Sequence, residues 1–104
     1  MSKVVTVRIS PELDDQLMLL AKEIGLSKSA MMRVAIMKYL DVDNIGDYCQ
    51  ITVNSDNSRR INVILTQILQ SIVEDQAKKL NTTANSLINY ACYKIVDHYM
   101  SFLA

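Results

Sequence analysis

The chain has 104 residues, half of them apolar with only two glycines and one proline, a composition that excludes a disordered chain and favours a mainly helical fold. A chain of this length forms one compact domain, or two small units that must share a core. Its 11 basic and 11 acidic residues give a net charge of zero, so nucleic-acid binding would have to rest on a local basic surface.

The first elements predicted along the chain are a strand and a helix. Apolar residues alternate with polar ones over residues 5–9, which is the period of a strand with one buried face. Ser10 and Pro11 predict a helix start, because serine is a good N-cap and proline at the first helical position loses no hydrogen bond. Gly25 predicts the end of this helix. Its predicted buried stripe consists of Leu13, Leu17, Leu20, Ala21 and Ile24.

A second helix is predicted to begin after an N-cap at Ser27 and to run to about Leu40. Between Ala30 and Leu40 only Arg33 and Lys38 are polar, so this helix is apolar nearly all round and has to be surrounded. One short strand and one helix cannot surround it. A second copy of the unit must therefore complete the core.

The sequence supplies that copy at an offset of 56 residues. The offset pairs, without a gap, Lys3 with Arg59, Val5 with Ile61, Val7 with Val63, Ile9 with Leu65, Gly25 with Asn81, and Ser27 with Thr83. Because turn and cap residues match as well as apolar ones, we interpret the chain as a duplicated unit. The second copy predicts a strand over about 60–65, a helix over about 67–80 and a last helix from Thr83 to about Phe102, with Tyr90 and Tyr93 in the core.

We therefore predict two strand-helix-helix units, residues 1–40 and 59–104, joined by a linker over residues 41–58. Within the linker, residues 48–54 are either an extra strand or an extended segment. Two such strands satisfy each other's backbone groups when they pair antiparallel. The linker is long enough for pairing within one chain or between two chains, and effective concentration favours pairing within the chain.

The outward face of the paired strands is the candidate DNA-reading surface. A two-stranded ribbon fits the major groove of B-DNA, which is about 12 Å wide. The predicted base contacts are Thr6 and Arg8 from one strand and Arg60 and Asn62 from the other. Arginine suits guanine, asparagine suits adenine, and threonine can meet a thymine methyl group. The alternative is that Thr6, Arg8 and Asn62 are ordinary outward strand residues, with Arg8 as a charge that protects a strand edge.

Candidate phosphate contacts lie at the strand starts and at the starts of the second helices, where free N–H groups attract anions. These candidates are Lys3, Ser27, Lys28, Ser29, Arg59, Thr83 and Asn85. Ser27 and Thr83 serve as helix caps in either case, and Arg59 is alternatively the solvated end of a loop.

The first copy resembles the ribbon-helix-helix superfamily (MetJ, Arc and CopG), and most of all the CopG-type plasmid copy-number repressors. The residues that carry the resemblance are Val5-Thr6-Val7-Arg8-Ile9-Ser10 and Gly25-Leu26-Ser27-Lys28-Ser29-Ala30-Met31. The resemblance covers residues 3–40 well and residues 59–98 only through the internal repeat. It implies a mainly α, tandem ribbon-helix-helix fold with a two-stranded antiparallel β-ribbon. Effective concentration favours forming this ribbon within one chain, as an intrachain pseudo-dimer. The resemblance also implies base contacts from Thr6 and Arg8.

Three positions depart from the family pattern. Val4 stands at an outward strand position where a basic residue is expected. In the second copy Ile64 takes the place of Arg8 and Ala84 takes the place of Lys28, so that copy is the weaker candidate for DNA contact. A ribbon formed from the two copies is asymmetric, and its site need not be palindromic.

The resemblance implies a sequence-specific DNA-binding repressor, from a plasmid, a phage or another mobile element. A second interpretation is a DNA-binding accessory factor for plasmid transfer or partition. A third is a protein-binding module such as an antitoxin or inhibitor, which the neutral net charge and the tyrosines of the last helix favour. Expected partners are double-stranded DNA and, as open alternatives, self-association on DNA, a homodimer or another protein.

Other classes of function find little support. Cys49 and Cys92 lack a CxxC spacing and His98 is the single histidine, so we expect no metal site and no cofactor. No nucleophile or second base has a recognisable spacing to His98, and we expect no enzyme activity. No secretion signal and no run of 18 apolar residues is present, which favours a cytoplasmic protein without a membrane segment.

Overall fold

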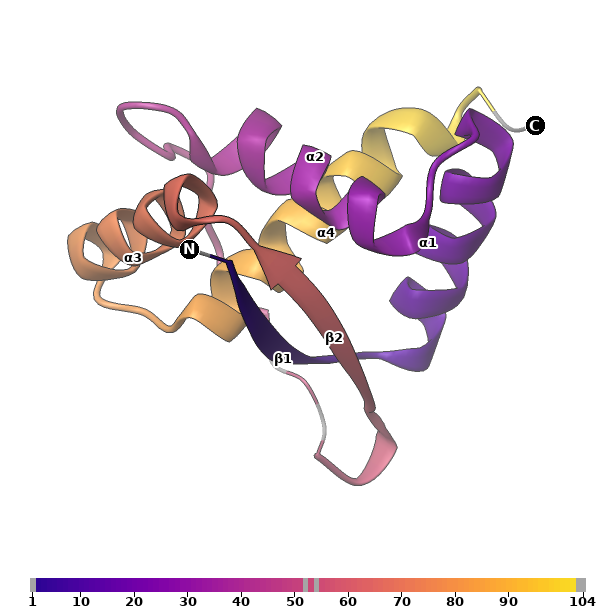
Figure 1. The fold of residues 1–104 in the computed structure, drawn as a ribbon, viewed down its shortest axis with the longest axis horizontal. Coiled ribbons are helices and arrows are strands. Elements are labelled where there is room, and N and C mark those ends of the chain that lie inside the picture. Colours follow the sequence, from indigo (N-terminus) through magenta and orange to yellow (C-terminus); the bar gives the residue numbers. More distant parts are fainter. Residues whose placement is uncertain (1, 52, 54, 103–104) are drawn as a thin grey trace.

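The computed structural model describes residues 2–51, 53 and 55–102. Its helices and strands are β1 (Lys3–Ile9), α1 (Pro11–Ile24), α2 (Lys28–Leu40), β2 (Arg59–Leu65), α3 (Gln67–Leu80) and α4 (Ala84–Met100), with a short 3-10 turn at Ser55–Asn57 (Figure 1). The order strand, helix, helix occurs twice and confirms the predicted mainly α fold. The first strand begins two residues earlier than predicted, and the last helix ends two residues earlier.

Local sequence signals determine where the helices begin and end. The hydroxyl groups of Ser27 and Thr83 accept hydrogen bonds from backbone N–H groups three residues further along the chain, as N-caps do. Gly25 and Asn81 end the first helix of each copy with left-handed φ angles of 91° and 52°. Glycine and asparagine tolerate this conformation better than other residues do. The turn between the two helices therefore begins with the same left-handed backbone conformation in both copies.

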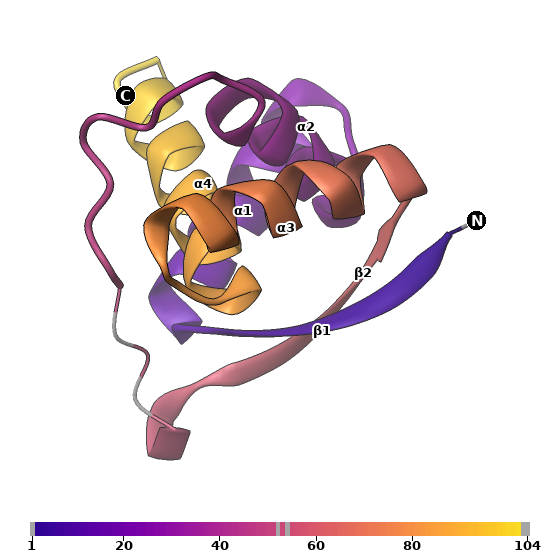
Figure 2. The ribbon, with the colours of Figure 1, turned by 90° about the vertical axis from the view of Figure 1, so that its left-hand side faces the viewer.

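The strands β1 and β2 pair antiparallel within the chain and form the two-stranded sheet. Their register places Val4 opposite Ile64, Thr6 opposite Asn62 and Arg8 opposite Arg60 (these are the pairs that point outward). All four α-helices lie on one side of this ribbon, which leaves most of the other side open, and the short turn Ser55–Asn57 projects on that side at the start of β2 (Figure 2). The chain is thus an intrachain pseudo-dimer of two ribbon-helix-helix units.

Both copies contribute to one hydrophobic core. Its largest fully buried side chains are Val7, Ile9, Leu17, Leu20, Met31, Met32, Ile36, Leu40, Leu65, Leu87, Ile88 and Ile95. The stripe predicted for α1 is buried except for Ile24, which is 45% exposed because it lies at the end of the helix. Neither copy could bury these side chains alone, which explains why the units share a core.

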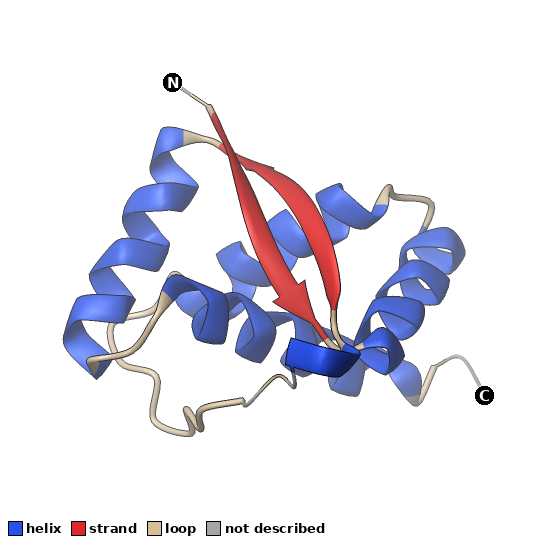
Figure 3. Cartoon of the chain, turned by 90° about the horizontal axis from the view of Figure 1, so that it is seen from below, coloured by secondary structure: helices blue, strands red, loops and turns tan. Residues whose placement is uncertain are grey.

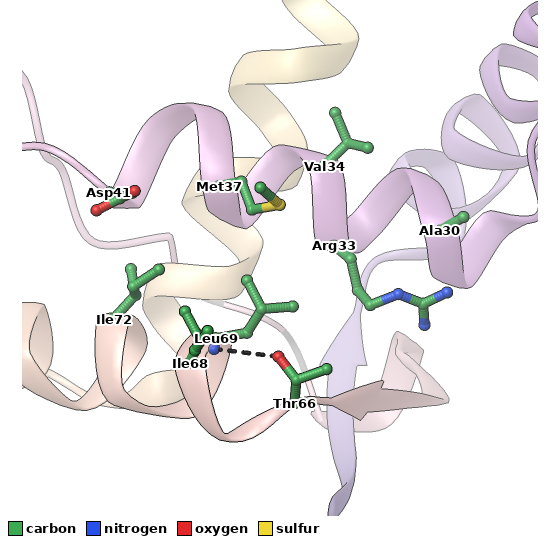
Figure 4. Close-up of a pocket in the computed structure, with 9 residues that line it drawn as sticks. All are labelled: Ala30, Arg33, Val34, Met37, Asp41, Thr66, Ile68, Leu69 and Ile72. Carbon is green, nitrogen blue, oxygen red and sulfur yellow. Dashed lines mark hydrogen bonds between the residues drawn. The ribbon is translucent and has the colours of Figure 1, made fainter. Parts of the chain in front are cut away.

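Two further expectations about burial were wrong. The second helix, α2, is not surrounded, since Val34 and Met37 are exposed beside Ile68 of α3. These side chains line an apolar groove of about 460 Å³ between α2 and α3 (Figure 4). Tyr93, which we expected in the core, is 52% exposed. Met37 and Tyr93 are equivalent in the repeat, and both point away from the core that α2 and α4 share.

Residues 41–48 of the linker pack against the second unit. The side-chain amide of Gln76 donates to the carbonyl oxygens of Leu40 and Val42 at 2.9 and 2.7 Å. The Tyr48 hydroxyl lies 2.7 Å from those of both Thr82 and Ser86. The described residues of segment 48–54 contain no strand, and residues 52 and 54 lie outside the described part of the chain. Side-chain contacts with α3 and α4, in place of strand pairing, hold residues 41–48.

Candidate functional site

The open side of the ribbon carries six outward side chains, which we call the ribbon face: Val4, Thr6, Arg8, Arg60, Asn62 and Ile64. The residues between them, such as Val7 and Val63, are buried in the core. This alternation confirms the predicted strand period. Viewed from the ribbon side, the two strands cross in front of the helices (Figure 3). The ribbon face is therefore accessible to a large partner.

One end of the ribbon face is cationic. Arg8 and Arg60 stand directly opposite each other in the register, and we call this pair the arginine end. The guanidinium group of Arg8 donates to the hydroxyl of Ser58 at 3.2 Å. Within the described residues, neither arginine forms an ion pair. Like charges directly opposite each other destabilise a sheet, so an anion bound between them would relieve a repulsion.

The middle of the ribbon face is polar. The Thr6 hydroxyl donates a hydrogen bond to Oδ1 of Asn62 at 3.0 Å. This contact sets the orientation of the Asn62 amide, and the carbonyl oxygen keeps a second lone pair for another donor. The pair is suited to contacts with groups that both donate and accept hydrogen bonds.

The other end of the ribbon face is apolar. Val4 and Ile64 lie directly opposite each other, and we call them the apolar end. They are 60% and 51% exposed. The face thus changes from apolar to polar to cationic along its length.

Helices α2 and α4 cover the outer edges of the ribbon with polar side chains. The Asn85 side chain accepts from the backbone N–H of Arg8 at 2.8 Å, and the Asn89 amide donates to the Arg8 carbonyl oxygen at 2.8 Å. On the other edge, Arg33 of α2 donates to the carbonyl oxygen of Ile64 in β2 at 3.4 Å. Unpaired strand edges invite aggregation, and these contacts occupy three backbone groups along the edges.

Sequence reasoning missed the role of Asn89, although a signal was present. Arg33 and Asn89 occupy equivalent positions of the repeat, and each is polar within a mostly apolar helix. A polar residue kept at the same place in both copies indicates a backbone group that needs a partner.

Two predicted phosphate contacts meet at a buried carboxylate. Lys28 and Arg59 both bind Asp14, at 2.8 and 2.9 Å, and Arg59 also binds the exposed Asp15 at 2.7 Å. Burial acts to raise the pKa of Asp14, but hydrogen bonds from the two cations outweigh it and hold this pKa below its usual value. The cluster takes up part of the donor capacity of Lys28 and Arg59. In the second copy Gln70 replaces Asp14, and its amide donates to the Leu65 carbonyl oxygen.

The remaining predicted phosphate contacts are dispersed. Lys3 is exposed at the start of β1, and Ser29 is half-buried in the first turn of α2. Ser27 and Thr83 are exposed N-caps, whereas the Asn85 side chain binds the backbone of β1. For all seven candidates, phosphate binding stays a prediction.

The described part of the chain offers no other site with evident chemistry. No three histidine, cysteine, aspartate or glutamate side chains within residues 2–51, 53 and 55–102 are grouped to hold a metal ion. None of the described helices is both long enough and apolar enough to cross a membrane.

Comparison with known proteins gives one match. Residues 3–41 match the family model described as ribbon-helix-helix protein, copG family. Comparisons with curated proteins and with solved structures return no significant match. The family match covers β1, α1 and α2, and thus includes half of the ribbon face.

Proposed function

We propose that the chain is a sequence-specific DNA-binding repressor, because residues 3–41 match the copG family of ribbon-helix-helix proteins, which are generally DNA-binding transcription regulators. In this proposal the ribbon face enters the major groove of duplex DNA. The two copies act together, because each supplies one strand of the ribbon.

The observation that carries the proposal is the arginine end. Arg8 and Arg60 face each other on the open side of the ribbon, outside the ion pairs of the described residues. Their mutual repulsion weakens the free protein, so stability alone does not favour the arrangement. A guanine edge offers two acceptors to an arginine, and nearby phosphates supply negative charge.

The polar middle of the face supports direct reading of bases. Asn62 can accept from N6 and donate to N7 of an adenine, and Thr6 holds the Asn62 carbonyl oxygen in place. A preset side chain loses less conformational entropy when it binds.

Phosphate contacts would position the ribbon in the groove. The start of α4 lies beside the ribbon, since Asn85 binds the backbone of Arg8. Lys28, at the start of α2, shares Asp14 with Arg59 at the first residue of β2. Helix starts attract phosphates, and these two positions lie near the ribbon face.

Binding selection tests the proposal. The wild-type chain is incubated with randomised duplex DNA at two salt concentrations, and the bound DNA is sequenced. We expect an enriched motif and a salt dependence that steepens by about 0.9 in the logarithmic slope for each phosphate neutralised.

The matching variant replaces both arginines of the arginine end, Arg8→Ala with Arg60→Ala, and the control is Lys22→Ala at the far end of α1. We expect the motif to vanish or broaden for the double variant and to persist for the control. Absence of any enriched motif with the folded wild type contradicts the proposal and favours the protein-binding module. Mapping the motif to a promoter, or to a transfer origin, then separates a repressor from an accessory factor.

A further inference from the structure

The apolar end is the part of the ribbon face to which the proposed arginine and asparagine contacts with DNA assign no role. Val4 and Ile64 are both more than half exposed, and they lie side by side on the face that points away from the core. A cross-strand pair of β-branched residues stabilises a ribbon by about 1 kcal/mol at most, whereas their exposure favours aggregation, so folding alone is a weak reason to keep two of them together.

The repeat shows that the two ends of the face are equivalent positions with exchanged chemistry. The offset of 56 residues relates Val4 to Arg60 and Arg8 to Ile64. A ribbon of two identical first strands would place a valine opposite an arginine at each end. In this chain both arginines lie at one end and both apolar residues at the other.

From this sorting we propose that the ribbon reads DNA in one direction, with the apolar end in contact with the C5-methyl groups of thymine and the arginine end in contact with guanine. The inference rests on the proposed function and deepens it by naming the bases. The preferred site is then a non-palindromic sequence.

The chemistry of the major groove favours thymine at the apolar end. Thymine is the base that presents a methyl group there, whereas guanine, adenine and cytosine present hydrogen-bonding groups. An apolar side chain pressed against those groups removes their water without replacing its hydrogen bonds. Val4 and Ile64 therefore select thymine by attraction and disfavour the other bases.

The dimensions are also compatible with one continuous site. Four residues separate Val4 from Arg8, which is about 13 Å at about 3.3 Å per strand residue. Base pairs are spaced about 3.4 Å apart, so the two ends contact bases about four steps apart.

A protein partner at the apolar end is less well supported. A stable protein interface buries about 800 Å² on each side, far more than two side chains provide. The neighbouring residues of the ribbon face, Thr6 and Asn62, are polar and bonded to each other.

The test uses the selected duplex with deoxyuridine in place of each thymine in turn, which removes the methyl group and leaves base pairing intact. For wild type we expect an affinity loss of about four-fold per contacted methyl group, confined to one end of the motif. The double variant Val4→Ser with Ile64→Ser removes the side-chain methyl groups and should lose this discrimination. The matched control is Ile68→Ser, at an exposed isoleucine on α3, which should retain it.

The outcomes separate the inference from the proposed function. A directional motif whose thymine methyl groups matter for wild type and not for the double variant supports the inference. A palindromic motif, or equal binding of thymine and deoxyuridine sites, overturns the inference and leaves DNA binding intact. Absence of selective binding by the folded wild type overturns both.

Discussion

At the scale of single residues, the arginine end carries an unfavourable interaction in the free protein. Arg8 and Arg60 are direct cross-strand neighbours of like charge, at the open side of the ribbon. Replacing a residue that weakens the fold and strengthens DNA binding should raise the free energy of unfolding and lower the affinity for DNA. Replacing a residue that only supports the fold should not raise the free energy of unfolding.

We expect Arg60→Thr to raise the free energy of unfolding by about 0.2 to 1 kcal/mol at low salt, because it removes a like-charge pair. The same substitution should weaken binding to the selected DNA by about five-fold or more, which corresponds to the loss of one arginine contact with guanine. Urea unfolding and a binding titration measure the two effects. A variant that loses both stability and binding would contradict this assignment.

A second residue-scale prediction concerns Asp14, whose carboxylate is nearly buried between Lys28 and Arg59. Its lowered pKa means that the ionised form stabilises the fold above pH about 3.8, and that this stabilisation is lost as the pH falls through the lowered pKa. Asp14→Asn should therefore lower the free energy of unfolding near neutral pH by about 1.5 to 3 kcal/mol and flatten its dependence on acid.

Urea unfolding between neutral and acidic pH measures this effect. The control is Asp15→Asn, since Asp15 binds the same arginine but is 66% exposed. Equal effects of the two substitutions would show that burial of Asp14 is unimportant.

The same cluster shows what the sequence could not predict. Lys28 and Arg59 have the residue types and places of phosphate contacts, yet their shared partner comes from α1. A contact between three elements depends on how those elements pack, which local patterns do not encode. Ribbon-face side chains were easier to predict, because strand alternation alone determines which residues point outward.

At the scale of elements, the linker and the open face of α2 differ most from expectation. Caps and turn residues predicted the helix bounds to within two residues. Residues 41–58 have no period, so the packing of residues 41–48 against α3 and α4 could not be predicted. The expectation that α2 is surrounded was wrong. A hydrophobic sequence pattern shows that a helix face is apolar, but it does not show that another element packs against that face.

Part of the covered surface on α4 is equivalent to the open surface on α2. Ser86 and Tyr90, which contact Tyr48, stand 56 residues after Ala30 and Val34, which line the groove.

The Tyr90 hydroxyl also donates to Asp47 at 2.6 Å, and burial together with this carboxylate raises the pKa of Tyr90. Hydrogen bonds from Lys94 and Tyr90 hold the pKa of Asp47 below its usual value. The linker thus attaches to the second unit through specific polar contacts.

We expect Tyr48→Phe to lower the free energy of unfolding by about 1 kcal/mol, because the hydroxyl contacts with Thr82 and Ser86 are lost while the ring remains. Chemical denaturation measures it. The control Tyr93→Phe, at an exposed position of α4, should change the free energy of unfolding little. A neutral Tyr48→Phe would show that the linker contacts are too weak to matter.

At the scale of the whole molecule, the shared core implies that both units unfold together. The two cysteines report on this directly. Cys49 is exposed in the linker, whereas Cys92 is fully buried in α4, and burial raises the pKa of its thiol to about 12. Reactive thiolate at Cys92 therefore requires opening of the core.

We expect a thiol reagent to label Cys49 at once and Cys92 only at the rate at which the protein opens. In the Cys49→Ser variant, the labelling of Cys92 should follow urea in parallel with unfolding measured by circular dichroism. Fast labelling of Cys92 in the absence of urea would mean that the second unit opens separately from the first.

The covalent connection between β1 and β2 has a genetic consequence. When two identical chains form a ribbon, one codon changes both strands, so a substitution that improves one base contact alters its symmetric counterpart as well. Here each of the six positions of the ribbon face is encoded once. A mutation can therefore retune recognition of one base pair and leave the others unchanged, which lets the preferred sequence drift one base at a time.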